Sequence, residues 1–141
     1  VEKDSIVLTF DVDSDDFTRA GEASSRLKRT LKQMGLPPDI IRRISIVMYE
    51  GEINMVIHAH GGKITVTVDD DAVTMVLADV GPGIPDVEKA MQAGWSTASE
   101  AVRQQGFGAG MGLPNMKKNA DTLEIDTVVG VGTTVTAVVR L

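Results

Sequence analysis

The fold of this chain is decided by residues 63–85, which read KITVTVDDDAVTMVLADVGPGIP. Lys63–Asp69 and Ala72–Asp79 each place an apolar residue at every second position, and a short acidic turn separates them. This pattern predicts two strands joined as a hairpin. The Gly-Pro-Gly-Ile-Pro stretch that follows is typical of a turn and ends the second strand at Asp79. The segment therefore predicts a sheet in which a carboxylate stands at the end of an apolar strand.

Apolar periodicity and turn residues predict further elements on both sides of this hairpin. They are a strand over residues 5–12, a helix from Ser14 as its cap to about Met34, a helix of roughly 20 residues from Pro38 that ends before Gly61, a short helix over 86–93, a helix over about 113–120, and closing strands over 122–129 and 133–141. Helices combined with a hairpin-rich sheet imply a two-layer α/β sandwich. The 141 residues are expected to form one domain, 1–141.

The composition limits the classes of function. Apolar residues make up 43% of the chain but aromatic residues only 4%, so the core must be aliphatic. The absence of cysteine excludes disulfides, thiolate metal sites and cysteine nucleophiles. A net charge of −6 argues against nucleic acid as the main partner. Without an apolar stretch near the roughly 20 residues of a membrane span, the chain is expected to be a soluble, cytoplasmic protein.

Glu50 and Asn54 are the first candidate site residues. They are four residues apart in the long predicted helix and therefore share one face. A carboxylate can orient or deprotonate a nucleophile there, while an amide oxygen helps to hold Mg²⁺. The alternative is a solvated polar stripe on an amphipathic helix. Gly51, in mid-helix, suggests the close approach of a ligand or a strand, and Glu52 is expected to point away into solvent.

Asp79 is the second candidate, followed by Gly81 and Gly83. An ionised carboxylate only accepts hydrogen bonds, so it would select adenine, whose exocyclic amino group is a donor. The two glycines would let the chain turn and a flat base approach. A plain turn after a strand is the alternative, because turns routinely use glycine and proline.

A run of alternating glycines, GFGAGMGLP over residues 106–114, is the third candidate. Exposed amides in a glycine loop that leads into a helix form an anion site, suited to phosphates. The run fits neither register of the dinucleotide motif and lacks the Gly-Lys-Ser/Thr of a P-loop. A flexible linker is the alternative. Between the last two strands, the Gly130–Thr134 segment reads as a hairpin turn whose threonine hydroxyl could reach a base.

Together these segments resemble the N box, G1 box, G2 box and terminal Gly-Thr motif of the GHKL ATPase/kinase superfamily, which includes DNA gyrase B, MutL and the sensor histidine kinases. The resemblance covers Ile44 to Leu141. It implies the Bergerat ATP-binding fold, a two-layer α/β (α+β) sandwich with a mixed, mainly antiparallel sheet and helices on one face. The motifs DVGPGIPDVEKAM, GWST and GAGMGLP are similar to those of the small stand-alone anti-sigma-factor serine/threonine kinases and switch kinases of bacterial partner-switching systems.

The resemblance implies a role for each candidate residue. Glu50 would act on the substrate hydroxyl, Asn54 would ligate Mg²⁺, and Asp79 would hold the adenine amino group of ATP. Gly81 and Gly83 would shape the base pocket, and Gly108, Gly110 and Gly112 would wrap the phosphates. Thr133 would lie near the base.

The implied activity is Mg-ATP-dependent phosphorylation of a serine or threonine on a small STAS-type antagonist protein. The alternative is a non-catalytic, nucleotide-gated module that sequesters a sigma factor or another regulator. A homodimer is also expected, by analogy with related kinases.

Overall fold

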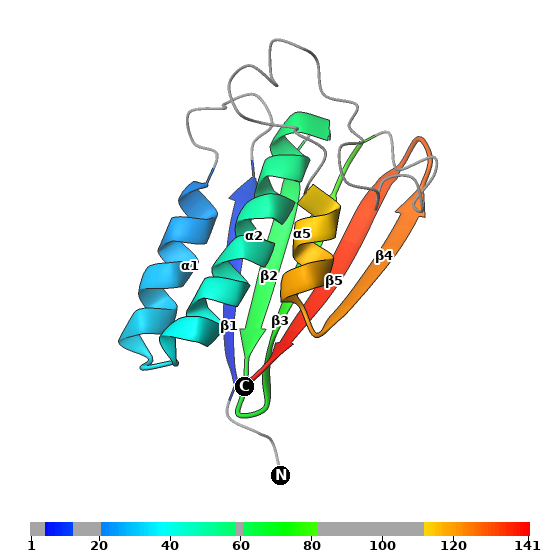
Figure 1. The fold of residues 1–141 in the computed structure, drawn as a ribbon. Helices are drawn as coiled ribbons and strands as arrows, with labels where there is room; N and C mark the ends of the chain where they lie inside the picture. Colours follow the sequence, from blue (N-terminus) through cyan, green and yellow to red (C-terminus); the bar gives the residue numbers. More distant parts are fainter. Residues whose placement is uncertain (1–4, 13–20, 59–60, 82–111) are drawn as a thin grey trace, which may run out of the picture.

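A computed structural model describes residues 5–12, 21–58, 61–81 and 112–141 (Figure 1). The elements, in chain order, are β1 (Ile6–Val12), α1 (Glu22–Gln33), α2 (Pro38–His58), β2 (Gly62–Val68), β3 (Ala72–Asp79), α5 (Gly112–Asn119), β4 (Thr122–Val128) and β5 (Gly132–Arg140). The helix predicted over 86–93 and the start of the helix predicted from Ser14 lie outside the described residues.

The five described strands form one sheet in the order β1-β2-β3-β5-β4. All four pairings between them are antiparallel, and the predicted hairpin is confirmed as β2 and β3, with Gly62 opposite Asp79. The helices α1, α2 and α5 lie together on one face of this sheet (Figure 1). The two-layer α/β sandwich predicted from the sequence is therefore confirmed.

The core lies between the sheet and these helices. Alternate residues of the inner strands point into it, so that Val73, Met75 and Leu77 of β3 are all buried. Helix α2 supplies its own apolar stripe, which includes Ile44 and Met48, both with no exposed surface. Phe10 is the only aromatic residue among the described core residues, as the aliphatic composition predicted.

Helix α1 begins later than the sequence suggested. Gly21 has a φ of 91°, a left-handed conformation that interrupts a helix, and the α-helix runs from Glu22 to Gln33. The space beside Gly21 is already filled, since a Cβ there would lie 3.1 Å from Tyr49 Cε1 of α2. A single helix through residue 21 is therefore wrong. The predicted end of the helix at Gly35 is confirmed.

Gly51 marks the place where α2 lies directly on the sheet. A Cβ at this position would be 2.2 Å from Leu77 Cδ2 of β3 and 3.2 Å from Met116 Cε of α5. Of the two explanations offered for a mid-helix glycine, the close approach of a strand is the one observed. Gly51 therefore sets the depth of α2 in the core, and with it the position of the polar residues on either side.

The expectation that Glu52 points into solvent is wrong. Its side chain is only 3% exposed. Oε2 accepts a hydrogen bond from the Ala23 N–H at 3.2 Å, and Oε1 accepts bonds from the Ser24 N–H at 3.1 Å and the Ser24 hydroxyl at 2.8 Å. The first turn of a helix has free N–H groups and a positive dipole end, which together favour a carboxylate. Because α1 begins beside this face of α2, Glu52 caps it.

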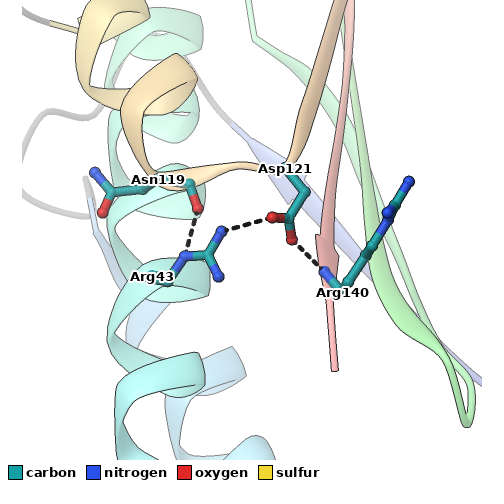
Figure 2. A network of polar contacts seen from close by, with 4 residues as sticks. All are labelled: Arg43, Asn119, Asp121 and Arg140. Carbon is teal, nitrogen blue, oxygen red and sulfur yellow. Dashed lines mark hydrogen bonds and ion pairs between the residues drawn. The ribbon is translucent and has the colours of Figure 1, made fainter.

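A polar network holds the C-terminal end of α5 (Figure 2). The Arg43 guanidinium of α2 donates from Nε to the Asn119 carbonyl at 3.0 Å and from Nη2 to Asp121 Oδ1 at 3.2 Å. Asp121 Oδ2 accepts a bond from the Arg140 N–H of β5 at 2.6 Å. These bonds to Arg140 and Arg43 hold the pKa of Asp121 below its usual value. The network thus ties α5 to α2 and to the sheet.

None of the described helices is long and apolar enough to cross a membrane.

Candidate functional site

Asp79 stands at the end of β3, as predicted, and is half-buried. Its Oδ1 accepts a hydrogen bond from the Thr133 N–H of β5 at 2.8 Å. Burial raises the pKa of Asp79, and the bond from Thr133 partly offsets this rise. Within the described chain, no residue donates to Oδ2. One carboxylate oxygen is therefore fixed by the sheet while the other is available to a ligand.

Two glycines allow the neighbouring strands to lie close to Asp79. A Cβ on Gly62 of β2 would come within 2.2 Å of the Ala78 carbonyl oxygen, and a Cβ on Gly132 of β5 would come within 2.3 Å of the Asp79 carbonyl oxygen. Beyond the strand, the N–H of buried Gly81 donates to the Val131 carbonyl at 3.1 Å. The backbone on both sides of Asp79 is thus held by direct contacts, which orients the side chain.

Thr133 lies beside Asp79, but its contact with the carboxylate uses the backbone N–H. The side chain is buried and its hydroxyl forms a hydrogen bond with Thr127 Oγ1 at 2.8 Å. The sequence alone did not indicate Thr127 as a partner. The contact of Thr133 with a base stays a prediction.

Glu50 and Asn54 lie one turn apart on α2, and both are half-buried. Glu50 Oε1 accepts a long hydrogen bond of 3.4 Å from Asn115 Nδ2 of α5. Burial raises the pKa of Glu50, and the Asn115 bond partly offsets it. The Asn54 amide forms no hydrogen bond with any described side chain. It can therefore act as a ligand without breaking an existing contact.

Asn115 was missed by the sequence analysis. Helix α5 begins at Gly112, the last glycine of the run, and packs against α2. Asn115 lies one turn into this helix, and its amide thereby reaches Glu50. The contact depends on how α5 packs on α2, which no pattern in the sequence reveals. The other predicted glycines lie outside the described residues: Gly83, Gly108 and Gly110.

The comparison with known families agrees with this geometry. A family described as the histidine kinase-like ATPase domain matches residues 14–139. The chain belongs to the histidine kinase-like ATPase family. The resemblance to the GHKL ATPases and kinases is confirmed, and it extends over almost the whole chain.

Several known proteins are similar to this chain. The anti-sigma F factor of Caldanaerobacter subterraneus subsp. tengcongensis is 37% identical, and the match spans 67% of this chain and 66% of the relative. The serine/threonine-protein kinase RsbT of Bacillus subtilis is 31% identical over 82% of this chain and 85% of the relative. The anti-sigma F factor of Bacillus licheniformis is 32% identical over 74% and 73%, respectively.

The candidate site residues come from distant segments of the chain. Asp79 comes from the sheet, Glu50 and Asn54 come from α2, and Asn115 comes from α5. In the described part of the chain no group of three or more histidine, cysteine or acidic residues could hold a metal ion. Mg²⁺ often keeps only one or two protein ligands and takes the rest from water and phosphates. The amide oxygen of Asn54 therefore fits an Mg²⁺ ion that is held mainly by a bound nucleotide and water, and not one enclosed by protein ligands alone.

Proposed function

We propose that this protein is a Mg-ATP-dependent serine/threonine kinase that phosphorylates a small STAS-type antagonist protein. Membership of the histidine kinase-like ATPase family supports nucleotide binding. The observation that carries the kinase activity is Glu50, a half-buried carboxylate that is one helical turn from the amide of Asn54 and is held at one oxygen by Asn115.

The nucleotide would be recognised by Asp79. Its free oxygen accepts a hydrogen bond from the adenine amino group, while the oxygen bonded to Thr133 fixes the plane of the carboxylate. A guanine ring presents a carbonyl at the corresponding position and would repel this carboxylate. Gly81 and Gly83 would leave room for the base, and Gly108, Gly110 and Gly112 would offer backbone amides to the phosphates. Asn54 would contribute its amide oxygen to Mg²⁺.

Bound Mg-ATP supplies the γ-phosphoryl group and the positive charge that stabilises it during transfer. Glu50 then has one task, which is to hold the hydroxyl of the incoming serine or threonine and accept its proton at Oε2. Burial raises the pKa of Glu50, which makes it a stronger base than an exposed glutamate. Asn115 donates to Oε1 only, so Oε2 can face the substrate.

The alternative function is a nucleotide-gated module that sequesters a sigma factor or another regulator without catalysis. The similarity to proteins named anti-sigma F factor favours it. The two functions can also coexist in one protein. A cytoplasmic location and a homodimeric state belong to the same proposal.

A phosphoryl-transfer assay with radiolabelled ATP distinguishes the kinase from the non-catalytic sequestering module. The protein would be incubated with γ-labelled ATP, Mg²⁺ and the STAS-type protein encoded beside it, with a fluorescent ATP analogue used to measure binding in parallel. The kinase proposal predicts label on the antagonist, with transfer abolished by Glu50→Gln and ATP binding retained. If Glu50→Gln transfers label at the wild-type rate, Glu50 is not the base. If ATP binds without any transfer, the alternative module is favoured.

A further inference from the structure

Residues of α1, of α2 and of the turn between them line a groove. Its volume is about 580 Å³, and its lining extends along α2 from Pro38 to Glu50. Leu36, Ile41 and Ile46 give it an apolar floor. The groove therefore ends at the carboxylate that the proposed kinase activity requires, although no part of the proposed ATP site explains it.

The rim of the groove is positively charged. Lys28 and Lys32 of α1 line it together with Arg42 of α2, and among the described residues Glu50 is the only acidic one in the lining. Arg42 forms an exposed ion pair with Asp39 at 3.3 Å. No described carboxylate pairs with either lysine. This positive strip stands out because the whole chain carries a net charge of −6.

Two further features are typical of a protein-binding surface. Tyr49 lines the groove and remains 42% exposed, and exposed tyrosines are common anchors of protein interfaces. Ser45 also lines the groove, and its hydroxyl oxygen is the one buried side-chain polar atom of the described residues that has no hydrogen-bond partner. Such an atom favours a hydrogen bond from an incoming group, which a rotation about its χ1 would permit.

We propose that this groove docks an acidic, partly apolar segment of a partner protein and leads the hydroxyl of that segment to Glu50. The unpaired lysines attract the carboxylates, the apolar floor buries one aliphatic side chain, and Tyr49 packs on the segment. The inference rests on the proposed function only for the role of Glu50, because docking itself requires no catalysis.

The spacing of the groove restricts the sequence of the segment. Arg42 and Glu50 are eight residues apart on a helix, which corresponds to about 12 Å along its axis. An extended chain advances about 3.3 Å per residue, so about four residues cover this length. This length is that of the groove along α2, and the two lysines line the same groove, so the carboxylates of the partner are expected within about four residues of the acceptor hydroxyl. An acidic residue directly beside that hydroxyl would instead face Glu50 and be repelled.

Fluorescence anisotropy can test this docking. The probe is a fluorescein-labelled peptide of about 12 residues, with two aspartates and a leucine about four positions from a serine. A matched peptide has asparagine in place of each aspartate. Saturable binding is expected for the acidic peptide, at least tenfold weaker binding for the asparagine peptide, and weaker binding of the acidic peptide at higher salt. Equal binding of both peptides, or no binding up to millimolar concentration, would overturn the proposal.

Charge reversal on α1 tests the location. Lys28→Glu combined with Lys32→Glu should reduce peptide affinity at least tenfold, and Lys32→Glu alone should reduce it about threefold. Arg29→Glu is the matched control, because Arg29 is an exposed cation of the same helix that does not line the groove. Equal losses of peptide affinity from Lys32→Glu and Arg29→Glu would show a general charge effect and refute binding of the peptide in the groove. A labelled oligonucleotide that binds more tightly than the acidic peptide and depends on the same lysines would also refute it.

The same variants distinguish this inference from the kinase proposal. Their circular dichroism and their affinity for a fluorescent ATP analogue should equal those of the wild type, because the reversed charges lie on α1. Peptide binding that depends on the lysines, without any phosphoryl transfer, would support docking in the groove and refute the kinase activity. Transfer to the antagonist at the wild-type KM in the Lys28→Glu, Lys32→Glu variant would support the kinase activity and refute docking in the groove.

Discussion

Replacement of Glu52 by alanine should destabilise the fold strongly, although the sequence suggested a side chain that points into solvent. The carboxylate is 3% exposed and accepts three hydrogen bonds from the first turn of α1. In Glu52→Ala the N–H groups of Ala23 and Ser24 and the Ser24 hydroxyl lose their acceptor. A buried donor without a partner costs about 1–3 kcal/mol, so the loss of the acceptor shared by these three donors should cost about 3 kcal/mol or more in total.

Glutamine should cost much less than alanine at this position. Both bonds from Ser24 end on Oε1, so a glutamine carbonyl placed there keeps them. Only the bond from the Ala23 N–H to Oε2 is lost. The expected loss for Glu52→Gln is about 1–2 kcal/mol. For Ser24→Ala, which removes one hydroxyl donor, it is about 1 kcal/mol.

Urea denaturation followed by circular dichroism measures these differences. The expected order of stability is wild type, then Ser24→Ala and Glu52→Gln together, then Glu52→Ala. The double variant Glu52→Ala, Ser24→Ala should cost less than the sum of its parts, since both changes remove one shared contact. A loss below about 1 kcal/mol for Glu52→Ala would refute the reasoning, because surface substitutions fall within that range.

Three further predictions concern the packing and the titration of the site. Gly51→Ala should lower the free energy of unfolding in urea by about 0–2 kcal/mol, because crowding of its Cβ against Leu77 Cδ2 at 2.2 Å costs about 1–3 kcal/mol while alanine regains about 1 kcal/mol over glycine in a helix. The pKa of Asp121 is lowered in the folded state, so its stabilising contribution is complete above its unfolded pKa of about 3.9 and is lost as the pH falls through the folded value. The stability difference between wild type and Asp121→Ala should therefore shrink in acid and disappear at the lowest pH, whereas a difference independent of pH would contradict this origin. Asn115→Ala removes the bond that lowers the pKa of Glu50, so the acid limb of the pH profile of the phosphoryl-transfer rate should move to higher pH. An unchanged acid limb would show that Asn115 does not act on the base.

Elements governed by local pattern could be predicted from the sequence. The hairpin of β2 and β3 has the predicted residues to within one position, because apolar side chains alternate along both strands and a short acidic turn joins them. The position of Asp79 at the end of β3 followed from the glycines and prolines after it. The end of α1 followed from Gly35. In each case the deciding signal lies within a few residues of the feature.

Features that depend on contacts between distant residues could not be predicted. A helical projection separates the face of Glu50 from the face of Glu52, but it does not show that α1 covers the second face. Asn115 is 65 residues from Glu50 in sequence, so its contact depends on how α5 packs on α2. The bond from Thr133 to Asp79 uses a backbone N–H, which every residue except proline carries, and no residue type reveals it.

Asp79 is proposed to select an adenine nucleotide, and calorimetric titration of wild type and Asp79→Asn with ATP and with GTP tests this selection most directly. The wild type should bind Mg-ATP and prefer it over Mg-GTP by at least tenfold. In Asp79→Asn, an amide replaces one acceptor oxygen by a donor, so ATP should bind at least tenfold more weakly and the preference should fall towards one. Equal affinities of the two proteins for ATP, or a wild type that binds ATP and GTP alike, would contradict the assignment of Asp79.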